Sequence, residues 1–308
     1  MFDEREASPG KILAILFAGL ITFGLAPILV RFTTDTEPLA LAALRTGFAV
    51  LCLFPFWFPQ RKTIPELKKL GISRLLLAIT GMCLGLHFSF WIASLHYTSV
   101  ASASVLVTMH PVMLIVAESL IFKKRFRGIV WFGVILAFTG SALLGMADDA
   151  GLDAFPNALL GNTLAFTAAV IFVIYFMLGR KIRQYTDWID YVFYVYLYAT
   201  ITCAVLMIFW TGGIPQITGT ALLVGLGLAV GPTILGHGSM NYAVKFVSPT
   251  LLSTLLLSEG VIAAIAAYLI FSELPSAFSL GAMGVILVGV SMTWYRKVAR
   301  KPENKVET

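Results

Sequence analysis

The chain has 308 residues, of which 58% are hydrophobic and only 12% are charged, and its mean hydropathy is +0.88. Soluble domains carry about a quarter charged residues, so this composition argues against a soluble enzyme and predicts residence in a lipid bilayer. The net charge of +6 does not indicate nucleic-acid binding, because the basic residues gather in short loops on one side of the apolar runs.

Ten apolar runs follow one another along the chain, each near the length of about 20 helical residues that a bilayer core requires. The first run is longer than the core of a signal peptide and is expected to be a retained span. Residues 75–122 are too long for one crossing and contain a polar break at 96–99, which favours ten spans over nine. The runs cover residues 11–30, 38–58, 74–94, 99–122, 128–146, 157–178, 190–211, 220–243, 248–271 and 277–295.

The basic residues predict the orientation of these spans. With the N-terminus inside, 20 of the 22 Lys and Arg residues fall on one side, which the positive-inside rule assigns to the cytoplasm. Of the two remaining basic residues, Arg31 falls on the other side and Arg45 lies within a span. The acidic loop at 147–156 is expected on the same side as Arg31. We therefore expect a multi-pass protein of the cell (inner) membrane with both termini in the cytoplasm.

The sequence repeats itself at an offset of 149 residues. This offset pairs Ser99 with Ser248 and residues 120–122 with residues 269–271. Each half then holds five spans, and because five is odd the second half enters the membrane from the opposite side. The expected fold is an all-α membrane protein of ten transmembrane helices in two inverted five-helix repeats. The expected units are residues 1–150, residues 151–297 and a basic cytoplasmic tail at 298–308.

Several strings in both halves carry a family resemblance. They are Leu86–Leu95, Tyr97–Ser102 and His110-Pro111 in the first half, and Gly236-His237, Asn241–Ala243, Ser258–Gly260 and Phe271–Pro275 in the second. Over nearly its whole length the chain resembles the drug/metabolite transporter superfamily, in its EamA-type branch. The resemblance implies a ten-helix carrier whose central cavity is reached alternately from each side. It also implies substrates such as amino acids or related metabolites and their export from the cell. The Glu-Pro pair common in that family is absent from both halves, which have His110-Pro111 and Glu259-Gly260 instead.

Glu259 lies near the middle of its span. An ionised carboxylate there costs roughly 2.5 to 3.5 kcal/mol, so it should be protonated, paired or in contact with water. Glu259 either carries a coupling proton or contacts a cationic part of the substrate, or it is a protonated group bonded to a neighbouring helix. The repeat places His110 at the same depth, directly before Pro111, whose ring disrupts the preceding turn. That break either lines a cavity or only bends the helix.

Two spans each carry a pair of polar or aromatic side chains four residues apart. His87 and Trp91 share one helical face, and so do His237 and Asn241, so both spans are expected to border the cavity. Both spans also carry a GxxxG motif, at 81–85 and 227–231, which permits close helix approach. The glycine-rich eighth span either bends during transport or packs statically.

Arg45 lies well below the external surface, where it can attract a substrate carboxylate or balance Glu259. The repeat pairs it with Tyr194, whose ring can stack on a planar or cationic substrate or belong to an aromatic helix interface. Glu118 lies near the cytoplasmic end of its span beside Lys123 and Lys124, and we expect it to snorkel or pair there in a structural role.

The sequence thus predicts a secondary transporter that moves a small organic metabolite across the lipid bilayer by alternating access. No phosphate-binding GxxxxGK[ST] loop is present in the sequence, so the energy should come from gradients, with Glu259 as the candidate proton carrier. We expect no enzymatic activity, cofactor, metal site or nucleic-acid partner, and the choice between monomer and homodimer stays open. An intramembrane lipid-modifying enzyme and a non-transporting membrane sensor are the alternatives. The candidate substrate-binding residues are Arg45, His87, Trp91, His110, Tyr194, His237, Asn241 and Glu259.

Overall fold

A computed structural model describes residues 8–33, 36–61, 73–98, 100–121, 123–147, 157–272 and 274–294, and every regular element in these ranges is a helix. Eight helical segments are long and apolar enough to cross a membrane, and two shorter apolar segments, Val105–Ile121 and Gly128–Leu144, accompany them. The all-helical class is therefore confirmed. The fourth and fifth of the ten predicted spans correspond to the two shorter segments, and the tail at 298–308 lies outside the described residues.

The helix bounds follow the apolar runs closely. Serine and threonine side chains cap several helices, because they accept the backbone N–H groups that have no partner within the first turn. Ser73, for example, accepts from Leu76 N at 3.1 Å, and Thr218 accepts from Ala221 N at 3.1 Å. The helices before residue 150 are α1 (Pro9–Gly24), α2 (Ala26–Val30), α3 (Pro38–Trp57), α5 (Arg74–Tyr97), α6 (Val100–Val107), α7 (His110–Ile121) and α8 (Gly128–Ala147).

The helices after residue 150 include three that together form one interrupted span. Its middle part, η3, is a π-helix that contains Pro232. These helices are α9 (Ala158–Arg183), α10 (Trp188–Thr211), α11 (Gly219–Leu228), η3 (Ala229–His237), α12 (Gly238–Ala243), α13 (Pro249–Leu256), α14 (Glu259–Phe271) and α15 (Ala277–Trp294).

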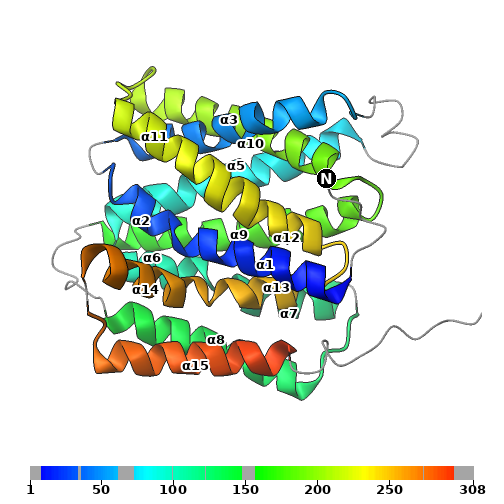
Figure 1. Cartoon of the computed structure of the whole chain (residues 1–308), viewed down its shortest axis with the longest axis vertical. Coiled ribbons are helices and arrows are strands. Elements are labelled where there is room, and N and C mark those ends of the chain that lie inside the picture. Colours follow the sequence, from blue (N-terminus) through cyan, green and yellow to red (C-terminus); the bar gives the residue numbers. More distant parts are fainter. Residues whose placement is uncertain are drawn as a thin grey trace, which may run out of the picture.

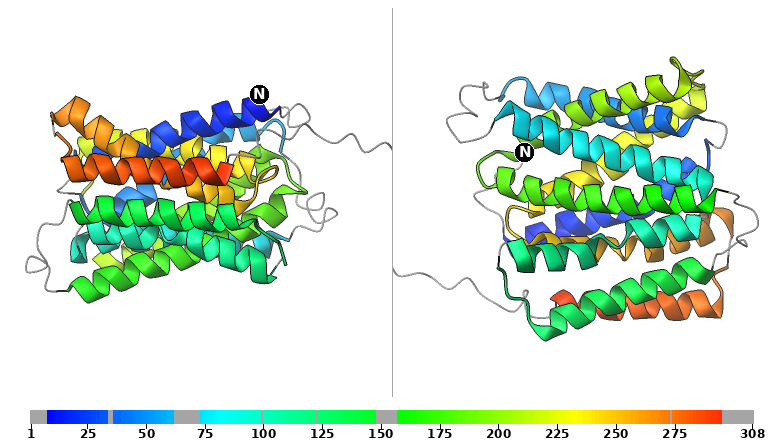
Figure 2. Two further views of the ribbon diagram at one scale, coloured as in Figure 1. Left: turned by 90° about the horizontal axis from the view of Figure 1, so that it is seen from below. Right: turned by 180° about the vertical axis from the view of Figure 1, so that it is seen from behind.

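The helices lie side by side with their axes roughly parallel, and partners distant in sequence pack together (Figure 1). Helix α8 packs along α15 at one end of the molecule, while α3, α5 and α10 pack together towards the other end. Between these groups, α9 packs on α5 and α6, and α1 packs on η3 and α14. Figure 2 shows the same order from two other sides. Segments from both halves of the chain therefore meet in the middle.

Two spans are broken at equivalent positions. Thr108 and Met109 form a turn between α6 and α7, and Leu257 and Ser258 form one between α13 and α14. The first break precedes Pro111, as predicted. The second has no proline, and it follows a segment in which Ser253 and Thr254 donate hydrogen bonds to the carbonyl of Thr250. Such bonds compete with the helical ladder. The two breaks are separated by the same 149 residues as the sequence repeat.

The two GxxxG motifs have different packing. A Cβ atom on Gly81 would lie 2.5 Å from the carbonyl oxygen of Val195, and one on Gly85 would lie 2.8 Å from that of Ala199, both on α10. A Cβ atom on Gly227 would lie 3.5 Å from Leu29, which is ordinary contact. The first motif thus serves close static packing of α5 on α10.

Candidate functional site

Three histidine rings from three helices surround Phe172 of α9. The ring centroid of Phe172 lies 4.6 Å from that of His110, 5.1 Å from that of His87 and 6.4 Å from that of His237. All four side chains are buried. Nδ1 of His87 lies 3.0 Å from the carbonyl oxygen of Ala168, whereas Nδ1 of His110 is buried with no hydrogen-bond partner among the described residues. Helices α5, α7 and η3 thus converge on one mixed aromatic and polar cluster.

Arg45 of α3 joins this cluster from the side of Phe88. Its guanidinium carbon lies 4.1 Å from the centroid of the Phe88 ring, and its Nε donates to Oγ1 of Thr233 at 3.1 Å. The Phe88 ring in turn lies edge-on to His237, with centroids 4.9 Å apart. Arg45 is only 3% exposed, so its charge is held by one hydrogen bond and one aromatic face. A cation held in this way can still accept an anionic ligand.

Asn241 belongs to a neighbouring hydrogen-bonded group. Its side-chain oxygen accepts from the hydroxyl of Tyr175 at 2.7 Å, and its backbone carbonyl accepts from Nε of Arg183 at 2.8 Å. Its Nδ2 is buried with no hydrogen-bond partner among the residues that the structure describes. The carbonyl of Thr233 accepts from the hydroxyl of Tyr196 at 2.8 Å, so Thr233 contacts both Arg45 and Tyr196.

Glu259 is the first residue of α14 and is partly buried. The guanidinium of Arg45 interacts electrostatically with Glu259, and the expectation that the two charges balance each other stays a prediction. The N-terminus of a helix also favours a negative charge. Burial opposes the ionised form of Glu259, whereas Arg45 and the helix N-terminus favour it.

Two other predicted site residues lie elsewhere. The ring of Tyr194 packs at 5.7 Å from Trp57 and at 6.0 Å from Phe193, an aromatic interface at the end of α3. Trp91 lies one turn beyond His87 on α5, and its Nε1 is buried with no hydrogen-bond partner among the described residues. The structure therefore brings Arg45 and the three histidines together, and it places Tyr194 in a separate cluster.

The sequence reading missed Phe88, Phe172 and Thr233, which connect the predicted residues. Phe88 and Phe172 stand in long apolar runs, where a phenylalanine carries no signal of a special role. Tyr196, which the sequence did not single out, is also fully buried, and its hydroxyl donates to the carbonyl of Thr233. Only the location of neighbouring helices determines which aromatic residues face the cluster.

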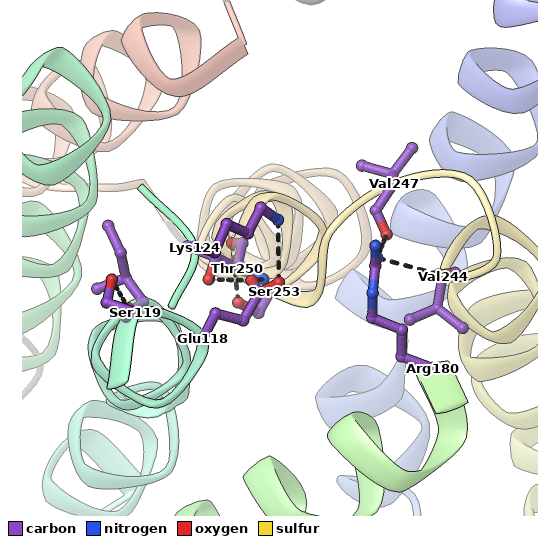
Figure 3. Close-up of polar contacts among 9 residues, drawn as sticks. Glu118, Ser119, Lys124, Arg180, Val244, Val247, Thr250 and Ser253 are labelled. Carbon is purple, nitrogen blue, oxygen red and sulfur yellow. Dashed lines mark hydrogen bonds and ion pairs between the residues drawn. The ribbon is translucent and has the colours of Figure 1, made fainter. Parts of the chain in front are cut away.

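Glu118 forms a separate polar site at the end of α7 (Figure 3). One carboxylate oxygen lies 3.0 Å from Nζ of Lys124, and the other accepts from the backbone N–H and the hydroxyl of Thr250, at 3.0 and 2.5 Å. Glu118 is 1% exposed. Partial burial lowers the pKa of Lys124 below its ordinary value, and the carboxylate of Glu118 partly offsets this. The predicted pairing of Glu118 is confirmed.

Comparison with known proteins assigns the chain to a family. The profile of the EamA-like transporter family matches it twice, over residues 8–146 and 159–295. The chain belongs to the EamA-like transporter family. The two family matches and the apolar helices make it a multi-pass membrane protein. The family and a relative named as a transporter make it a membrane transporter.

This EamA-like transporter is similar to a curated protein and to several solved structures. It is 28% identical over 275 residues to the uncharacterized transporter YdfC of Bacillus subtilis, a match covering 85% of this chain and 82% of that protein. A crystal structure with 17% sequence identity superposes with a TM-score of 0.77, covering 94% of this chain and 99% of the other. At that identity the second likeness shows the shared fold alone.

Proposed function

We propose that this EamA-like transporter carries a small organic metabolite, an amino acid or a related compound, across the cell membrane by alternating access. The observation that carries the proposal is the cluster around Phe172, where Arg45 and three histidines meet deep inside a helical membrane protein. Polar and charged side chains are costly at this depth and usually mark a pathway for substrates or ions.

The chain supplies the cluster from both proposed repeats. His87, His110 and Arg45 come from the first, whereas Phe172 and His237 come from the second. The family profile matches each half separately, and the breaks before His110 and Glu259 recur at the repeat offset. Ten spans in two oppositely inserted halves would place these breaks at related depths in the membrane. Rocking of one half against the other would then expose the cluster to each side of the membrane in turn. The basic loops and both termini then face the cytoplasm.

The chemistry of the cluster favours a carboxylate-bearing substrate. Arg45 supplies the fixed cation, His110 supplies a ring nitrogen without a partner among the described residues, and Phe88 and Phe172 supply aromatic faces. An amino acid carries a carboxylate for Arg45 and an apolar part for the rings. Glu259, electrostatically linked to Arg45, is the proposed proton carrier, and export from the cytoplasm is the proposed direction.

A counterflow assay in sealed proteoliposomes tests the proposal. Vesicles are loaded with one unlabelled amino acid or related carboxylate, and the uptake of the labelled compound is measured without any ion gradient. We expect counterflow for a small set of these compounds. We also expect its loss in Phe172→Leu, which removes a ring contacting three histidines.

Phe166→Leu is the matched control, because Phe166 lies on the same helix but is 43% exposed. It should retain counterflow. If no compound of this class shows counterflow, or if both variants behave alike, the proposed site or substrate class is wrong.

A further inference from the structure

A hollow of about 390 Å³ lies at the end of α7 and α9, away from the histidine cluster. Its lining is mostly charged. Figure 3 shows three of the lining residues: Glu118 and Lys124 lie beside Thr250, and Arg180 lies beside Val244 and Val247. The lining residues are Glu118, Lys124, Arg180, Lys181 and Gln184. In the proposed orientation this end of the molecule faces the cytoplasm.

The hollow keeps a net positive charge once the ion pair within its lining is taken into account. Glu118, the single acid in the lining, is bonded to Lys124 and Thr250. Arg180 and Lys181 remain as two cations. Both hydrogen bonds of Arg180, to the carbonyls of Val247 and Val244 at 2.7 and 3.4 Å, use Nη1, so its Nη2 and Nε keep donors for an anion.

The helices beside the hollow expose apolar side chains that lead up to it. On α9, Phe166, Val170 and Ile174 are 43, 37 and 46% exposed and follow one another at intervals of four residues. Lys181, also exposed, lies two turns further along the same stripe. On α7, Leu120 is 74% exposed. Helices α7 and α9 contact each other and lie side by side on the face seen from behind in Figure 2.

From this arrangement we propose that the hollow binds the phosphate of an anionic phospholipid, with Arg180 and Lys181 on the phosphate and the acyl chains along the exposed stripe of α9. A stripe of exposed apolar side chains on a membrane-spanning helix contacts acyl chains, and its basic end lies at the level of the headgroups. The volume is sufficient for a phosphate with its headgroup. Nε2 of Gln184 donates to the carbonyls of Lys245 and Arg180 at 3.2 and 3.4 Å, so the two cations are the groups left for the phosphate.

Thermal unfolding of the purified full-length chain in detergent tests this site. Phosphatidylglycerol is titrated into the micelles, phosphatidylcholine serves as the neutral lipid, and inorganic phosphate and a short-chain phosphatidylglycerol are titrated separately. Long-chain phosphatidylglycerol should raise the unfolding temperature most, because ligand bound to the native state stabilises it. Lys181→Gln should weaken its apparent affinity about fivefold, the effect of one basic residue near a membrane surface.

Arg127→Gln is the matched control, since Arg127 is exposed, carries the same charge and does not line the hollow. It should leave the affinity unchanged, and the lipid-free unfolding temperature of each variant shows that it is folded. Equal effects of the two lipids, or equal effects of the two variants, would overturn the proposal. Stabilisation by inorganic phosphate or by the short-chain lipid as strong as that by the long-chain lipid would also overturn it, because the stripe would then contribute nothing.

Discussion

His110 and Glu259 occupy the same place in two broken spans. Each is the first residue of the second helical segment, directly after a two-residue turn, and they are separated by the 149-residue repeat offset. His110 contributes to the cluster around Phe172, whereas Glu259 interacts electrostatically with Arg45. The repeat thus places at equivalent breaks a carboxyl group and a ring nitrogen that has no hydrogen-bond partner among the described residues.

Glu259→Gln should abolish uptake driven by a pH gradient but retain counterflow at equal pH. The amide has nearly the same shape as the carboxyl group but cannot carry a proton. Both activities are measured in the same batch of proteoliposomes. Glu37→Gln, at the start of α3, is the control. Unchanged pH-driven uptake in Glu259→Gln would eliminate Glu259 as the proton carrier.

Arg45→Met should lower the affinity for a carboxylate substrate by about tenfold or more, since a hydrogen bond to a charged group contributes about 1.5 to 3 kcal/mol. Arg45→Lys should recover part of this loss, because it keeps the charge but not the planar fork. The half-saturation concentration in counterflow provides the measurement. The unfolding temperature should change little, because the hydroxyl of Thr233 keeps its bond to the carbonyl of Leu228. An equal loss for an uncharged analogue of the substrate would contradict the assigned role.

The sequence was sufficient to predict the features that depend on apolar runs and on residues that interrupt a helix. Apolar length located the helices, as shown by the agreement between the predicted run at 277–295 and α15, Ala277–Trp294. The proline at position 111 predicted the first break. The break after Leu256 was not predicted, because Ser253 and Thr254 bond to the backbone only in a helix that is already formed.

The candidate site could be predicted only in part, for a different physical reason. Buried charge and histidine are rare in a membrane, so Arg45, His87 and His237 stood out in the sequence. Phe172, which contacts all three histidine rings, is one of 23 phenylalanines and stands in an apolar run. Its role depends on helix contacts that local sequence does not specify.

Glu118→Gln should destabilise the fold by about 1 to 3 kcal/mol, because it removes a carboxylate that accepts two hydrogen bonds from Thr250 and pairs with Lys124. Denaturant or thermal unfolding in detergent measures this. Thr250→Val should lower stability less, since the backbone N–H of residue 250 still donates to Glu118. A double variant with Lys124→Gln should be less destabilised than the sum of the two single variants. Strict additivity would show that the pair is not coupled.

The same variant should respond to pH. Burial lowers the pKa of Lys124 and the carboxylate of Glu118 raises it, so the pKa of Lys124 falls further in Glu118→Gln. A lysine with a lower pKa in the folded state binds fewer protons there than in the unfolded state, so stability rises with pH. The deficit of Glu118→Gln should therefore shrink as the pH rises towards the ordinary lysine pKa of about 10.4. Unfolding curves at rising pH test this, and a constant deficit would contradict it.

The two GxxxG motifs should differ in their tolerance of alanine. Gly85→Ala places a Cβ atom 2.8 Å from the carbonyl oxygen of Ala199, a backbone atom that moves only if α10 shifts away from α5. Gly227→Ala places it 3.5 Å from a flexible Leu29 side chain and also removes the entropic cost of glycine in a helix. We expect Gly85→Ala to lower stability by about 1 to 3 kcal/mol. Gly227→Ala should be neutral or stabilising by up to about 1 kcal/mol. Unfolding in detergent measures the stability of the two variants. If both alanines changed the stability equally, α5 and α10 could move apart at no cost, which would contradict the close static packing of these helices.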